Sequence, residues 1–237
     1  MKGAQDGTHG NSRQRGVLDS KKWLRLILVF TIAQLALRYI IPNNSDHSWR
    51  VWVFYGWDAA ILYCFFHLMK QNKFYGFAVI CMIVKLVTNV AGQLAVTVFL
   101  DDLLRLLHTI NPKYDEYSSY SYLSVITTPL SVLSAIAGFL GYLFELWGHS
   151  GLTAPFDGNL AKKWKQLFFL DLGAGLLVSA LSYLFYFLYN ASILDLSAYQ
   201  IFYPLANLPV IATQILHLVY LWRTIQILVP KEEISNG

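Results

Sequence analysis

Six stretches of this sequence are apolar over about the length that a helix needs to cross a lipid bilayer, roughly 20 residues. Within lipid a chain must satisfy its backbone polar groups internally, and a run of this length does so as a helix. The composition agrees, because 56% of the residues are hydrophobic and only 14% are charged, whereas a soluble domain has about a quarter charged residues. The sequence therefore predicts an all-α, polytopic integral membrane protein with six transmembrane helices.

The expected helices are Trp23–Ile41, Val51–Met69, Phe74–Leu100, Tyr122–Trp147, Gln166–Asn190 and Gln200–Trp222. Pro204 and Pro209 each remove a backbone donor within the last of these runs, so a bend is predicted between them. Residues 103–110 have the leucine spacing of a short amphipathic helix on the membrane surface. We expect a flexible cytoplasmic tail over residues 1–20, one transmembrane domain over 21–228 and a short cytoplasmic tail over 229–237.

The charges of the loops predict the orientation, because Lys and Arg concentrate in cytoplasmic loops. With the N-terminus inside, the cytoplasmic segments hold Arg13, Arg15, Lys21, Lys22, Lys70, Lys73, Lys162, Lys163, Lys165, Arg223 and Lys231. The opposite side then receives Asp46, Asp101, Asp102, Asp115, Glu116 and Asp195. Both termini are therefore predicted to be cytoplasmic, in a multi-pass protein of the cell membrane.

Two opposite charges interrupt the second and third apolar runs. Asp58 lies eleven residues before Met69, and Lys85 lies eleven residues after Phe74. Because the rise per residue is the same in both helices, a hairpin through the short turn at residues 70–73 places the two charges at equal depth. An isolated charge there is costly, so we expect Asp58 and Lys85 to face each other and pair.

Other polar residues extend this predicted centre. Asn89 and Gln93 share the helix face that carries Lys85. Asp171 and Asn207 come from the fifth and sixth runs, so the sequence predicts a polar-lined interior between the second, third, fifth and sixth helices. The candidate centre for a solute, an ion or a structural contact is Asp58, Lys85, Asn89, Gln93, Asp171 and Asn207.

The fourth run has small residues along one side, which is typical of helix–helix packing in membranes. This packing face is predicted to comprise Ser131, Ser134, Ala135, Gly138 and Gly141, continuing to Tyr142 and Glu145. Glu145 and His149 are expected near the cytoplasmic edge, and residues 148–158 are expected to form a glycine-containing loop. Trp164, within a run of three lysines, is predicted to be an interfacial anchor.

The sequence contains no nucleophile elbow, zinc-protease motif, glycine-rich phosphate loop or Cys-x-x-Cys pair. It therefore favours a non-enzymatic protein over an intramembrane enzyme, which is kept as a third hypothesis. It predicts no catalytic residue, no metal site, no cofactor and no nucleic-acid partner. The leading hypothesis is a protein of the lipid bilayer that binds or translocates a small solute or ion at Asp58 and Lys85. The alternative is a non-catalytic partner of another membrane protein, an assembly, immunity or regulatory subunit, in which Asp58 and Lys85 form a structural ion pair.

Overall fold

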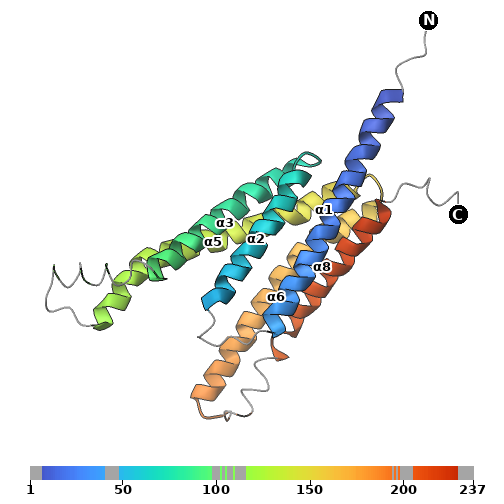
Figure 1. Cartoon of the computed structure of the whole chain (residues 1–237). Helices are drawn as coiled ribbons and strands as arrows, with labels where there is room; N and C mark the ends of the chain where they lie inside the picture. Colours follow the sequence, from blue (N-terminus) through green and yellow to red (C-terminus); the bar gives the residue numbers. More distant parts are fainter. Residues whose placement is uncertain are drawn as a thin grey trace, which may run out of the picture. The chain divides into compact units, whose positions relative to one another are not determined.

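The computed structural model describes residues 7–40, 48–97, 102, 105, 109, 116–193, 195, 197 and 205–228. These residues form helices and turns, with no strand among them. The helices are α1 (Gly7–Ile40), α2 (Ser48–Leu68), α3 (Lys73–Thr97), α5 (Glu116–Thr153), α6 (Gly158–Asn190) and α8 (Leu208–Ile227) (Figure 1). The chain divides into two compact units, residues 33–145 and residues 1–32 with 146–237. We call them the hairpin unit and the terminal unit and describe each by itself.

Five described segments are long and apolar enough to cross a membrane, namely Val51–Leu68, Lys73–Val96, Thr127–Thr153, Gly158–Asn190 and Leu208–Ile227. Many of their large apolar side chains are exposed, including Val87 on α3 at 60% and Leu176 on α6 at 65%. Apolar surface on this scale is unusual for a soluble protein and normal for one surrounded by lipid. The fold is therefore that of an all-helical, multi-pass membrane protein. The sixth crossing, within α1, and the cytoplasmic placement of both termini remain predictions.

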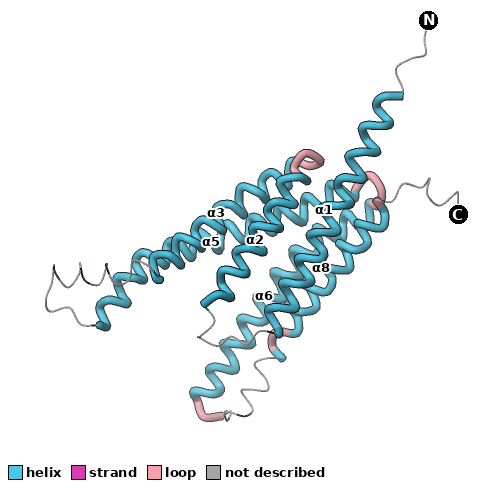
Figure 2. Tube along the Cα trace, viewed as in Figure 1, coloured by secondary structure: helices cyan, strands magenta, loops and turns pink. Residues whose placement is uncertain are grey.

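In the hairpin unit, α2 and α3 pack against each other and are joined by the turn at residues 69–72 (Figure 2). The boundaries lie close to the predicted ones because the polar turn separates two apolar runs. Asn72 begins α3 in a way that the sequence analysis did not identify: its side-chain oxygen accepts a hydrogen bond of 2.9 Å from the backbone N–H of Phe74. Such a contact satisfies one of the free donors at a helix start.

α5 brings its small residues against α3, as the packing hypothesis expects for part of the predicted face. A methyl group added at Gly141 would lie 3.3 Å from Cβ of Cys81, and one added at Gly138 would lie 3.7 Å from Cδ of Lys85. Ser131 and Ala135 are exposed instead, so that part of the predicted face was wrong. The contact face follows Ser134, Gly138 and Gly141, which repeat at four and three residues as one side of a helix does.

In the terminal unit, α6 and α8 lie side by side (Figure 1). The core of this unit contains Leu24 and Ile27 of α1 together with Trp164, Leu167 and Leu221, none more than 1% exposed. Trp164 is 0% exposed, so its predicted role as an interfacial anchor was wrong. The lysines that flank it remain at the surface or half-buried.

The predicted loop at residues 148–158 is largely helical. α5 continues to Thr153, and α6 already begins at Gly158. The glycines of this stretch suggested a loop, but the helix ends only before Pro155, because a residue that precedes proline avoids helical geometry. Asp157 then starts α6, and its side chain accepts hydrogen bonds from the backbone N–H groups of Asn159 and Leu160 at 2.9 and 3.0 Å.

Two other helices begin at residues that differ from the predicted ones, one earlier and one later. α1 begins at Gly7 and not near Trp23, since helical hydrogen bonding extends from the apolar run into the polar segment before it. α8 begins at Leu208, so Pro209 lies in its first turn. Backbone N–H groups in the first turn have no partner within the helix, so the N–H that proline lacks costs no hydrogen bond there. The structure describes a turn at residues 206–207 just before this start, and the predicted bend, which depends on Pro204, stays a prediction. Three predicted features lie outside the described residues, wholly or in part. They are Pro204, the tail at 229–237, and the surface helix at 103–110, of which only residues 105 and 109 are described.

The approach of α5 to α3 can be tested with one pair of variants. Gly141→Leu should lower the free energy of unfolding by about 1 to 3 kcal/mol, because a side chain there meets Cys81 and overpacks the contact. Gly173→Leu on α6 is the control, since a side chain there meets nothing within 4 Å. Thermal unfolding of the purified proteins in detergent measures both. Equal loss of stability in the two variants would contradict the assigned packing face.

Candidate functional site

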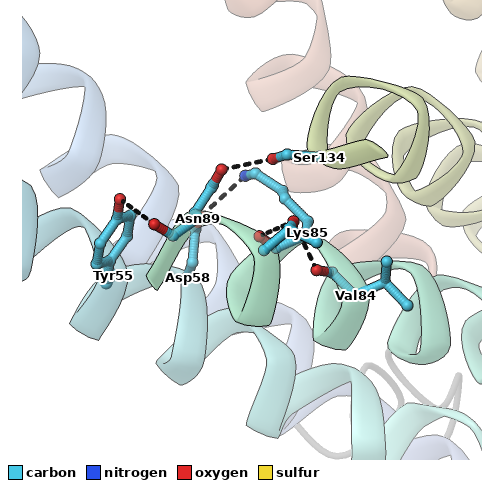
Figure 3. Close-up of polar contacts among 7 residues, drawn as sticks. Tyr55, Asp58, Val84, Lys85, Asn89 and Ser134 are labelled. Carbon is cyan, nitrogen blue, oxygen red and sulfur yellow. Dashed lines mark hydrogen bonds and ion pairs between the residues drawn. The ribbon is translucent and has the colours of Figure 1, made fainter. Parts of the chain in front are cut away.

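Asp58 of α2 and Lys85 of α3 form an ion pair, as the sequence predicts. The Lys85 Nζ donates a hydrogen bond to Oδ2 of Asp58 at 2.9 Å (Figure 3). The two side chains come from adjacent helices of one hairpin, near the middle of its two apolar segments. Their equal distance from the turn brings the two charges together, because the turn sets the register of both helices.

Aromatic packing next to the turn fixes this register. Phe65 of α2 and Tyr75 of α3 are both fully buried, and their rings stack with centroids 5.6 Å apart. Asp58 lies seven residues before Phe65 and Lys85 lies ten residues after Tyr75, about two and three helical turns away. A shift of one residue between the helices would separate the stacked rings as well as the charges.

The ion pair is partly buried. The side chains of Asp58 and Lys85 are 17% and 34% exposed, respectively. The aliphatic stem of Lys85 lies beside Gly138 of α5, where a methyl group added at the glycine would be in ordinary van der Waals contact with Cδ of Lys85, 3.7 Å away. Burying the stem while the ammonium group meets a carboxylate is the usual way to accommodate a lysine among apolar helices.

One turn beyond Lys85, Asn89 connects three helices. Its side-chain carbonyl oxygen accepts a hydrogen bond from the Ser134 hydroxyl of α5 (Figure 3). Its backbone carbonyl accepts one from the Tyr55 hydroxyl of α2 at 3.2 Å. Thr88 bonds within its own helix, to the carbonyls of Val84 and Lys85 at 2.8 and 3.0 Å. The polar groups around the ion pair therefore bind one another and hold α2, α3 and α5 together.

The remaining predicted residues separate into the two units. Gln93 belongs to the hairpin unit and is half-buried on α3. Asp171 belongs to the terminal unit, where its side chain accepts a hydrogen bond from the Thr213 hydroxyl of α8. Asn207, at the residue before α8, makes no side-chain capping bond to that helix. The described contacts thus support a centre of Asp58, Lys85 and Asn89, and a second polar contact at Asp171.

Sequence reasoning missed three partners of these residues. Tyr55 resembles an ordinary interfacial tyrosine, and Thr213 lies between Ala212 and Gln214 with no spacing that relates it to Asp171. Ser134 was assigned to packing only, whereas it both faces α3 and donates to Asn89. A hydroxyl is small enough to be buried and finds its acceptor through tertiary packing, so spacing along one helix does not identify the partner.

No family model matches this chain, and no curated protein or solved structure is significantly similar to it.

The bond from Ser134 to Asn89 generates a direct prediction. Ser134→Ala should lower the free energy of unfolding by about 1 to 2 kcal/mol, because the carbonyl of Asn89 loses its donor in a part-buried position. Ser131→Ala makes the same chemical change on an exposed part of the same helix and should have little effect. Thermal unfolding compares the two. A neutral Ser134→Ala would show that this bond contributes nothing to the packing of α5 on α3.

Proposed function

We propose that this membrane protein binds or translocates a small solute or ion at the Asp58–Lys85 pair. The observation that supports this proposal is the pair itself, a carboxylate and an ammonium group 2.9 Å apart within two membrane-spanning segments. Placing an Asp or a Lys near the centre of a spanning helix costs about 2.5 to 3.5 kcal/mol each. Apolar residues of similar volume would insert more easily and often pack as well.

The exposure of Lys85 favours exchange of its partner. About a third of the Lys85 side chain is exposed, and the proposal requires that a charged solute reach its ammonium group. An anionic group can take the place of the Asp58 carboxylate on Lys85, and a cation can take the place of Lys85 on Asp58. Each exchange pairs one of the two residues, and a solute that carries both charges, such as an amino acid, keeps Asp58 and Lys85 both paired while their own contact opens. We place this activity in the cell membrane.

A second candidate has its own supporting observation. Lys85 and Asn89 are held to α5 by the contact with Gly138 and the bond to Ser134, so the pair is part of a three-helix contact. A non-catalytic partner protein, such as an assembly, immunity or regulatory subunit, would use the pair only to fix how α2 and α3 pack. Its function would then depend on surfaces elsewhere on the molecule.

Neutralising the pair distinguishes these candidates. Asp58→Asn leaves Lys85 without its carboxylate and should lower the melting temperature, whereas Asp58→Asn with Lys85→Met should return it close to that of the wild type. Each protein is then melted with Na⁺, K⁺, amino acids and small carboxylates. A solute that binds only the folded state raises the melting temperature. At a concentration one hundred times its dissociation constant it raises the free energy of unfolding by about 2.7 kcal/mol.

The proposal predicts a solute that stabilises the wild type and has no effect on the double variant. A solute that stabilises both proteins equally would place its site elsewhere and contradict the proposal. If no solute in the panel stabilises the wild type while the double variant is as stable as the wild type, the structural role is favoured.

A further inference from the structure

Two histidines in the terminal unit surround the buried indole of Trp164. His149 of α5 is 0% exposed, and its ring lies against that of Trp164 with centroids 4.5 Å apart and planes 30° apart. His217 of α8 meets the same indole edge-on, with centroids 5.4 Å apart. The two imidazole centroids are 6.2 Å apart, and their planes are nearly perpendicular. Neither histidine belongs to the Asp58–Lys85 centre.

The surroundings hold this group in place from three helices. The indole N–H of Trp164 donates to the Thr224 hydroxyl at 3.0 Å, and that hydroxyl donates to the carbonyl of Tyr220 on the same helix. On the other side, the Ser150 hydroxyl, next to His149, donates to the carbonyl of Ala161 at 2.8 Å. The positions of the two imidazoles are therefore set by the packing of α5, α6 and α8.

The geometry brings metal-ligating atoms together. A ring nitrogen of His149 and one of His217 lie within 4.8 Å of each other. Glu145 precedes His149 by one turn on α5, so the two side chains lie on the same face of the helix. Two ligands of a tetrahedral Zn²⁺ ion are about 3.3 Å apart, given bonds of about 2.0 to 2.1 Å. The two ring nitrogens are therefore at most about 1.5 Å farther apart than this, a difference that small side-chain rotations would remove.

We propose that His149 and His217, with Glu145 as the third ligand, bind a divalent first-row transition metal ion. Two imidazoles and one carboxylate suit Zn²⁺ and its neighbours, whereas Mg²⁺ and Ca²⁺ prefer oxygen ligands alone and Cu⁺ prefers sulfur. Three protein ligands leave a fourth position for water or another small ligand. The sequence analysis predicted no metal site, because ligands contributed by α5 and α8 are separated by more than sixty residues and have no recognisable spacing.

Metal titration of the full-length protein in detergent tests this proposal. After treatment with a chelator, the wild type is titrated with Co²⁺, whose visible absorption reports four-coordinate binding, and then with Zn²⁺ as competitor. We expect one ion bound per chain. His217→Gln and Glu145→Gln should each weaken binding at least about tenfold, since even residues that only support a metal ligand contribute this much.

His67→Gln is the matched control, because His67 is a half-buried histidine on α2 of the hairpin unit. Its affinity for Co²⁺ should equal that of the wild type. Circular dichroism identifies variants that fail to fold, and Glu145→Gln, which nearly preserves side-chain shape, keeps the test decisive if His217→Gln is one of them. A wild type that binds neither ion would overturn the proposal and leave the group as aromatic packing. Equal weakening by His67→Gln, or no weakening by either ligand variant, would overturn it as well.

Discussion

A carboxylate and an ammonium group within apolar helices must meet, and this requirement shapes the hairpin unit. The bond between Asp58 and Lys85 is possible only if α2 and α3 are antiparallel neighbours in one register. The stacked rings of Phe65 and Tyr75 beside the turn set the same register. Two independent interactions therefore specify a single arrangement, which is how a sequence distinguishes its native packing from alternatives shifted along the helices.

Small residues and a hydroxyl of α5 meet α3 around the ion pair. The stem of Lys85 lies beside Gly138. Gly141 lets the backbone of α5 approach Cys81 and Ala78 closely, and Ser134 satisfies Asn89. Small residues and hydroxyls are the usual means of helix association in lipid, where burying apolar surface between helices gains little. In this unit they also surround a charge.

The sequence could predict the features that depend on chain geometry alone. Apolar run length and the polar turn located α2 and α3, and equal spacing from that turn paired Asp58 with Lys85. It could not predict contacts that depend on tertiary packing, such as the bond from Ser134 to Asn89. The same limit applies to Trp164, which was expected at the interface but is fully buried against His149. Glycines at 148 and 151 suggested a loop because glycine is common both in loops and in closely packed helices of membrane proteins.

The central claim is that Asp58 and Lys85 are energetically coupled, and exchanging the two charges measures this most directly. Asp58→Lys places two ammonium groups together and Lys85→Asp places two carboxylates together, so each single variant should be strongly destabilised. The account predicts that the exchanged double variant, with an opposite-charge pair restored, recovers most of the lost melting temperature, with a coupling of about 1 to 3 kcal/mol. Losses that simply add in the double variant would contradict it.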